Sequence, residues 1–326
     1  MNPRRVGAWV LAGLLGVAVF ADPLPPDWGY RGLVTIRGEL GPWPLEPLED
    51  LESLPSATRE GTLSAPLTGG RTLVVRNEVG SVRIQGTGEP VASLRYRVTV
   101  YARTAEAAEA YLAQVQVGLE SDPAGDRLVL STARPAAPAA VRRVQVDIDG
   151  AVPEGARVDV ANAYGTVELR GVGGPSKVAN RFGRTALEQV QGDWEVETGY
   201  GALEARGIAG SLQVRGDFGR HDIRDVAGNV AVQAAFGDVN IESLRRAADV
   251  RIRYGNATIR LAPPLDHRFD VEARFGSVSS RGQPLREAGT QFSEGSTQRW
   301  TALTGQGRYR VEVRAEFGNV LVATGP

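Results

Sequence analysis

The chain has 326 residues, of which 42% are hydrophobic, so it can bury a core as one large domain or two ordinary ones. Its formal net charge of −1 excludes the strong positive charge that usually accompanies binding to nucleic acid or to an anionic membrane surface. The absence of cysteine excludes disulfides, a thiol nucleophile, iron–sulfur clusters and a lipid-modified cysteine anchor.

Residues 1–21 have the pattern of a signal peptide. Two arginines at positions 4 and 5 precede an uncharged apolar run at 6–20, and Ala21 ends a cleavage site of small residues. The run is shorter than the roughly 20 residues of a typical membrane-spanning helix, which favours cleavage over anchoring. We therefore expect an exported protein of the periplasm, the cell surface or the extracellular space. An uncleaved N-terminal anchor stays open as an alternative.

Residues 22–58 are expected to form a spacer, because seven prolines and an acidic patch favour an extended chain. From residue 59 onward apolar and polar residues alternate, as in TLVVRNEVGSVRIQG, which predicts strands with one buried face. One helix is predicted at Thr104–Gln116. Thr104 suits its N-cap, and Ala108 and Tyr111 begin an apolar stripe. Such a helix would cap the sheets or cover one edge.

Regular repeats begin near Gly155. An aromatic residue followed by glycine recurs every eighteen residues, at Tyr164-Gly165, Phe182-Gly183, Tyr200-Gly201, Phe218-Gly219, Phe236-Gly237 and Tyr254-Gly255. The pair returns outside this period at Phe275-Gly276 and Phe317-Gly318. A fixed period over six copies is typical of a repeat architecture whose units bury their apolar faces by stacking.

The parity of the apolar positions predicts the shape of each repeat. Before the glycine, the apolar residues lie an even number of positions from the aromatic residue; after it, they lie three and five positions away. Two short strands therefore meet at a tight turn. The glycine is expected at positive φ, with the aromatic as the last inward side chain. A second corner is expected near Gly174, Gly192, Gly210 and Gly228.

Stacking such coils about 4.8 Å apart would align the aromatic rings in an internal ladder. It would also let Asn162 and Asn180 form hydrogen bonds along the interior. The predicted fold is therefore all-β with one short helix: a two-sheet β-solenoid of eighteen-residue coils over 59–326, regular over about 155–281.

The three-sided left-handed β-helix also has eighteen-residue coils, but it needs an aliphatic residue at every sixth position. Two residues after each aromatic, where that rule applies, stand Thr166, Arg184, Ala202, Arg220, Asp238 and Asn256. A two-sheet coil fits better.

The repeat NAYGTVELRGV and the preceding VQVDIDGAVPEGARVDVANAYG resemble the bacterial putative-adhesin β-strand-repeat domains, a family of unknown function. The resemblance extends from about Gly61 to the C-terminus. It implies an exported or envelope-facing repeat domain with an adhesive role, and it implies no catalytic residues.

Residues capable of catalysis are few. His221 is expected to point inward without a second ligand or base, and His267 to lie in a loop. Asp147 and Asp149 alternate with apolar residues and share a solvent face. Paired carboxylates could cleave a glycosidic bond or bind calcium, but a solvated strand face is the simpler interpretation. No nucleotide motif, cofactor motif or catalytic triad can be assembled.

The most regular exposed feature lies six residues after each aromatic. The column consists of Arg170, Glu188, Arg206, Arg224, Glu242, Arg260 and, after an irregular coil, Arg281. Arg170, Arg206, Arg224 and Arg260 are candidates for binding acidic polysaccharide or phosphate groups. The alternative is that the glutamates pair with flanking arginines and keep the sheet soluble.

We therefore expect a non-enzymatic, adhesion-like interaction module of the cell envelope, with an envelope polysaccharide or protein as partner and no cofactor. Two alternatives stay open: a carbohydrate-active enzyme of the solenoid type and a purely structural spacer. The enzyme would need at least two acidic residues and a basic one on a concave face.

Overall fold

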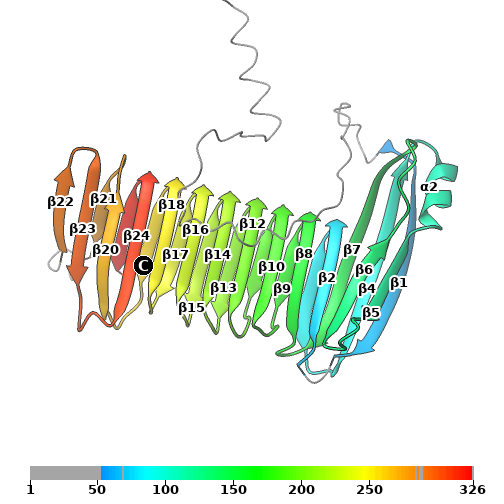
Figure 1. Cartoon of the computed structure of the whole chain (residues 1–326), viewed down its shortest axis with the longest axis horizontal. Coiled ribbons are helices and arrows are strands. Elements are labelled where there is room, and N and C mark those ends of the chain that lie inside the picture. The colour runs from blue at the N-terminus through cyan, green and yellow to red at the C-terminus, as the bar shows by residue number, and fades with distance from the viewer. Residues whose placement is uncertain (1–52, 68–69, 283–284, 286–288, 325–326) are drawn as a thin grey trace, which may run out of the picture. The chain divides into compact units, whose positions relative to one another are not determined.

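The computed structural model describes residues 53–67, 70–282, 285 and 289–324. The predicted signal segment and most of the predicted spacer lie outside these residues. The first described strand already begins at Ser56, within the predicted spacer. Over the described ranges the chain forms two sheets, of twelve and thirteen strands, and one helix of described bounds (Figure 1).

The first sheet contains, in spatial order, β1 (Ser56–Pro66), β4 (Val91–Ala102), β7 (Val141–Pro153), β3 (Val82–Thr87), β9 (Val167–Arg170), β11 (Thr185–Glu188), β13 (Leu203–Ile208), β15 (His221–Val226), β17 (Val239–Leu244), β19 (Ala257–Leu261), β25 (Val320–Thr324) and β21 (Val278–Arg281).

The second sheet contains, in spatial order, β22 (Gly289–Glu294), β23 (Thr297–Leu303), β20 (His267–Ala273), β24 (Tyr309–Phe317), β18 (Ala248–Tyr254), β16 (Val230–Phe236), β14 (Leu212–Phe218), β12 (Trp194–Tyr200), β10 (Ser176–Phe182), β8 (Arg157–Tyr164), β2 (Thr72–Val79), β6 (Arg127–Ala133) and β5 (Gln116–Ser121).

Successive strands of the repeats alternate between the two sheets. Each pairs in parallel with the strand eighteen residues later, so that Val178 lies opposite Val196 and Leu187 opposite Ala205. Each repeat is therefore one coil of two strands, and the coil stacks on its neighbours. The prediction of an all-β fold with two sheets and eighteen-residue coils is confirmed.

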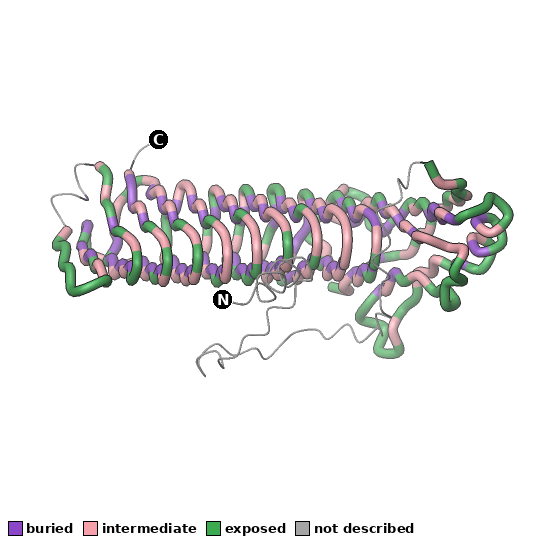
Figure 2. Tube along the Cα trace, turned by 90° about the horizontal axis from the view of Figure 1, so that it is seen from above, coloured by how far each residue is buried: buried purple, intermediate pink, exposed green. Residues whose placement is uncertain are grey.

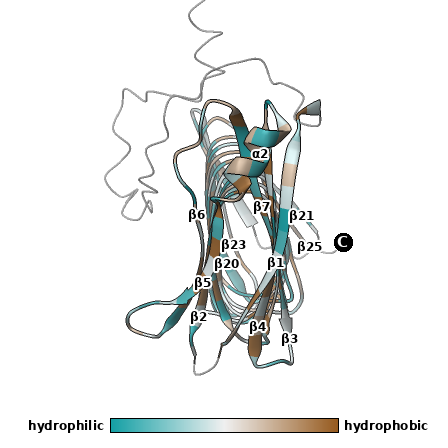
Figure 3. Cartoon of the chain, turned by 90° about the vertical axis from the view of Figure 1, so that its right-hand side faces the viewer, coloured by the Kyte–Doolittle hydropathy of each residue, from teal (hydrophilic) through white to brown (hydrophobic). Residues whose placement is uncertain are grey.

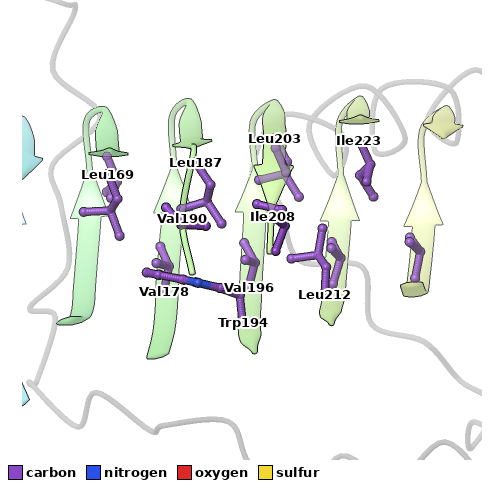
Figure 4. Close-up of a cluster of buried hydrophobic side chains, with 14 of the residues drawn as sticks. Leu169, Val178, Leu187, Val190, Trp194, Val196, Leu203, Ile208, Leu212 and Ile223 are labelled. Atoms are coloured by element: carbon purple, nitrogen blue, oxygen red, sulfur yellow. The ribbon is translucent and has the colours of Figure 1, made fainter. Parts of the chain in front are cut away.

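The core lies between the sheets and consists of columns of aliphatic side chains. Leu169, Leu187, Leu203 and Ile223 from the first sheet face Val178, Val196, Leu212 and Trp194 from the second (Figure 4). Buried residues alternate with intermediate and exposed ones along the coils (Figure 2). A single coil would leave these aliphatic side chains in contact with water above and below it. Only the stacking of neighbouring coils buries them.

At the N-terminal end, β2 and β3 form a coil that stacks directly on β8 and β9, with Asn77 opposite Asn162. The residues between this coil and β8 form the long antiparallel strands β4 and β7, the helix α2 and the antiparallel pair β5–β6, and β1, which precedes β2, pairs with β4. Viewed along the stack, β1 and β4 lie opposite β2 and β5, and α2 lies at one end of the gap (Figure 3).

The helix α2 spans Ala105–Leu112, which is shorter than predicted. Thr104 is its N-cap as expected, because the side chain of Thr104 accepts a hydrogen bond from the Ala107 N–H. Gln116, the predicted last helical residue, instead begins β5. Tyr111 is buried, and the helix contacts β1, β4 and β7. It therefore covers the apolar side of the N-terminal edge strand.

The last coil does not lie at the end of the stack. Strands β24 and β25 insert between the coil β18–β19 and the coil β20–β21, although the latter comes earlier in the chain. A regular succession of coils to residue 281 is thus interrupted after residue 261, and an antiparallel hairpin, β22–β23, follows β20 in the second sheet.

Candidate functional site

The corner after each second-sheet strand is built around the predicted glycine. Five of the six have φ between 129° and 142°, and Gly201 has φ 158°. A Cβ atom on any of them would collide with the carbonyl oxygen of the equivalent glycine one coil earlier. The column begins at Gly80, where Val79 replaces the aromatic residue. Glycine is needed both for the backbone angle and for the close approach of neighbouring coils.

The aromatic residues of these corners form one continuous ladder, hereafter the aromatic ladder. Neighbouring ring centroids are 4.7–5.0 Å apart and the ring planes lie within 8° of parallel. In spatial order the rings are Tyr164, Phe182, Tyr200, Phe218, Phe236, Tyr254, Phe317 and Phe275.

The prediction that this ladder is internal was wrong. Tyr200 is 40% exposed, Tyr254 36%, Phe317 37% and Phe275 55%, and the other four rings are partly exposed. Strand pairing omits the residue before each aromatic: Thr198 pairs with Gly216 and Tyr200 with Phe218, but the residues between do not pair. This local break in the pairing turns the next side chain from the interior to the edge of the coil.

The candidate arginines form a column on the outer face of the first sheet. Arg170, Glu188, Arg206 and Arg224 lie in register across four strands. Glu242 follows Arg224 in that register and also pairs with Arg260, at an N–O distance of 3.2 Å. Arg281 does not adjoin Arg260, because Ala323 of the inserted strand β25 lies between them.

Each candidate arginine has a carboxylate partner. Glu188 lies 3.9 Å from Arg170, Glu204 lies 3.8 Å from Arg206, and Glu242 lies 2.9 Å from Arg224. The guanidinium groups nevertheless keep 38–57% of their side-chain surface exposed. Surface ion pairs of this kind contribute only about 0–1 kcal/mol each, so an anionic ligand could compete with them.

Asp147 and Asp149 lie outward on β7, as predicted, and line a hollow of about 250 Å³ on the first sheet. Its other lining residues are Glu60, Ser81, Arg83, Arg95, Tyr96 and Arg97. The hollow therefore contains the acidic and basic residues that an enzyme of the solenoid type would need, a grouping that the sequence does not reveal because four separate segments supply it.

The carboxylates of this hollow are already partnered. Arg97 pairs with Glu60 at 2.7 Å, and Arg83 lies 3.5 Å from Asp149. The Asp147 carboxylate accepts hydrogen bonds from the Ser81 N–H and hydroxyl. Burial alone would raise the pKa of Asp147, but these hydrogen bonds, one from Gln145 and the charge of Arg83 lower it overall. Asp147 is thus held as an anion and is poorly suited to donate a proton.

Both histidines are buried. His221 points inward, as predicted, with Nε2 3.3 Å from the Thr198 hydroxyl. Its ring occupies the space above Gly216, where a Cβ atom would collide with it. The prediction for His267 was wrong: this residue begins β20 and is fully buried. Its backbone N–H donates a hydrogen bond to the Thr304 hydroxyl, and its carbonyl accepts one from the Thr304 N–H. Within the described ranges no three metal-ligating side chains gather in one place.

The interior asparagines are arranged as predicted. The Asn162 side-chain amide donates to the Asn180 Oδ1 at 3.2 Å, and Asn77 extends the row by donating to Asn162. Asn180 in turn donates to the Thr185 hydroxyl and to two backbone carbonyls. Since the bonds between the asparagine side chains are buried, this row stabilises the stack.

No protein-family model matches the sequence, and no curated protein matches it. The structure is similar to a putative cell adhesion protein from Clostridium sporogenes, at 14% identity and TM-score 0.28, covering 82% of this chain and 100% of the other. It is also similar to a putative adhesin from Bacteroides fragilis, at 11% identity and TM-score 0.40, covering 82% and 97%. A putative lipid binding protein from Parabacteroides distasonis matches at 9% identity and TM-score 0.34, covering 82% and 97%.

The resemblance to bacterial putative adhesins noted in the sequence is therefore seen again among solved structures. Identities of 9–14% do not transfer a function from those proteins to this chain. Among the described residues no helix is long and apolar enough to span a membrane.

Proposed function

We propose that the chain is an exported, non-enzymatic interaction module of the cell envelope that presents a rigid, repeated surface to an envelope polysaccharide or protein. The observation that carries this proposal is the register of the coils. Because like positions align at every coil, the outer face presents its side chains in columns at the spacing of the strands, about 4.8 Å. A partner with its own repeat would meet many weak contacts at once.

The arginine column is the proposed contact for acidic groups of such a partner. Arg206 and Arg224 are adjacent in register, half-exposed, and bound only by surface ion pairs. A carboxylated or phosphorylated polymer could exchange with Glu204 and Glu242 at little cost and form charge-assisted hydrogen bonds with several guanidinium groups.

The test is binding of the purified chain to an array of bacterial envelope glycans and host matrix polymers, with each bound glycan assayed for cleavage. We expect salt-sensitive binding without cleavage, lost in the double variant Arg206→Ala/Arg224→Ala. Arg215→Ala is the matched control, because Arg215 is an equally exposed, carboxylate-paired arginine on the second sheet. Binding that disappears equally in all variants, or no binding at all, would contradict the proposal.

A second candidate function, glycoside cleavage, is favoured by the hollow that contains Asp147 and Asp149. Glycosidases need one carboxylic acid with a raised pKa to protonate the leaving group. The lowered pKa of Asp147 counts against this role. Cleavage of a bound glycan that is lost in Asp149→Asn and in Asp147→Asn would establish the enzyme in place of the interaction module.

A further inference from the structure

The aromatic ladder is a second exposed surface, separate from the arginine column. It runs along the corners of the coils for about 33 Å, the total of its seven ring spacings. Side chains that served only to fill the core would be buried, as Trp194 is at 2% exposure, whereas four of these rings are at least 36% exposed.

The part of each ring that water reaches is its edge. Each inner ring lies between two parallel neighbours at 4.7–5.0 Å, so both of its faces are covered. Sugar rings and nucleobases stack on open aromatic faces, and the inner rings offer none. The strip is also only one ring wide, which is far too narrow to supply the roughly 800 Å² per partner of a stable protein interface.

A row of ring edges suits the face of another π-system. The edge of an aromatic ring carries partial positive charge and its face partial negative charge, so a flat conjugated molecule laid along the ladder makes edge-to-face contacts with several rings together. Tyr200 is the most exposed of the inner rings, at 40%, and small residues lie one position before it, Gly199, and two positions after it, Ala202.

The flank of the ladder at Phe182 favours an anion. Arg181 directly precedes Phe182 and Arg184 follows it by two residues, whereas Phe218 has the carboxylate of Asp217 directly before it and Arg220 two residues after it. Arg184 is paired with Glu204 and Arg220 with Asp222. The Arg181 guanidinium instead lies 5.8 Å from the centroid of the Phe182 ring, and it has no carboxylate within salt-bridge distance among the described residues.

We propose that the aromatic ladder binds an elongated, flat, conjugated anion that lies along the stack across Phe182, Tyr200 and Phe218. The ring edges supply the contacts and set the orientation, and Arg181 supplies the charge. This site goes beyond the proposed envelope interaction, and its failure would leave the arginine column untouched.

Congo red, a linear sulfonated dye, is the probe, and its binding to the purified chain is followed by absorbance and induced circular dichroism. We expect saturable binding that is at least fivefold weaker in Tyr200→Ser and in Arg181→Gln. The cationic dye thioflavin T should bind more weakly than Congo red. Phe292→Ser is the matched control, because Phe292 is 58% exposed but lies outside the ladder.

The variant Ala202→Glu is a second test of the site, for the case in which Tyr200→Ser lowers the stability of the fold. Arginine and asparagine occupy the same position of other coils, so a longer side chain fits there. The added carboxylate should weaken Congo red binding at least fivefold while the unfolding temperature stays unchanged. Absence of Congo red binding, equal loss in Phe292→Ser, or complete displacement of the dye by palmitate, which would indicate an acyl-chain site, would each overturn the proposal.

Discussion

His221 is the residue whose chemistry is changed most by its place in the stack. The same position holds Val167, Leu203 and Val239 in other coils, all buried and apolar. An imidazole fits only because Gly216 beside it has no side chain. Burial lowers the pKa of His221 from 6.5 to about 4, and the nearby charge of Asp222 only partly opposes this.

This lowered pKa predicts a stability loss in acid. The unfolded chain binds a proton at His221 below pH 6.5, whereas the folded chain does so only below about pH 4. The titration of His221 therefore leaves the free energy of unfolding undiminished above pH 6.5. It lowers that free energy as the pH decreases from 6.5 to 4, by up to about 3 kcal/mol. Urea denaturation at a series of pH values measures this loss.

The variant His221→Val isolates that contribution. It should remove most of the slope between pH 6.5 and 4, and a residual slope should come from His267, whose pKa burial also lowers. An identical pH dependence in the variant and the unchanged chain would show that His221 is not held neutral in the folded state.

Gln189 carries local backbone strain. Its φ is 52°, and the equivalent residues of neighbouring coils include Gly171 and Gly207, with φ of 63° and 67°. Because a Cβ atom disfavours this region, Gln189→Gly should raise the free energy of unfolding by about 0.5–1 kcal/mol. Gln191→Gly, at a nearby residue without positive φ, should lower it. Denaturant midpoints for both variants check the prediction, and a decrease in Gln189→Gly would contradict it.

Among single residues, the sequence predicts those whose type recurs with the period of the repeat. The six corner glycines and the paired asparagines follow from a repeated residue type at a repeated position. The left-handed residues seven positions after the aromatic do not, because glycine, glutamine, aspartate and serine all occupy that position. The long-range partners of His267 and of the hollow around Asp149 come from segments far apart in the chain, which no local pattern connects.

Among the structural elements of a coil, the corner rather than the strand determines how closely the coils stack. The strands are only four to eight residues long within the repeats, and the glycine column determines how closely their corners approach. The alternation of apolar residues predicts both strands correctly. It predicts the aromatic side chain on the wrong side, because parity assumes an unbroken strand and the pairing omits the residue before the ring.

Gly219→Ala tests the corner. Its φ is 135°, and the new Cβ atom would collide with the Gly201 carbonyl oxygen, which belongs to rigid backbone. We expect a loss of about 2–4 kcal/mol in the free energy of unfolding. Gly88→Ala is the matched control, because nothing lies within 4 Å of a Cβ atom there. Chemical denaturation of both variants measures the difference, and equal small effects would refute the role of the glycine column.

At the scale of the whole molecule, the chain order and the spatial order of the coils differ at both ends. The coil β2–β3 joins the regular stack although residues 91–153 separate it from the next coil. The sequence contains this signal as Asn77-Glu78-Val79-Gly80, which shares the asparagine and the glycine of Asn162-Ala163-Tyr164-Gly165 but lacks its ring. The insertion of β24–β25 cannot be predicted, because Phe275-Gly276 and Phe317-Gly318 fit the same corner equally well.

Removal of residues 304–326 tests this insertion. It would delete β24, the strand that joins β18 to β20. We expect residues 267–303 to lose protection in hydrogen exchange while the coils of residues 157–261 keep theirs, because each coil depends mainly on its neighbours. If the coils instead stacked in chain order, residues 267–281 would stay protected in the shortened chain.

Hydroxyl-radical footprinting of the purified chain, read residue by residue by mass spectrometry, measures directly whether the aromatic ladder lies on the surface. A rigid repeated surface with an external aromatic ladder predicts rapid oxidation of Tyr200, Tyr254, Phe275 and Phe317, and protection of the buried Trp194 and Tyr111. Protection of the ladder rings equal to that of Trp194 would place the ladder in the core and contradict the surface on which the proposed ligand site depends.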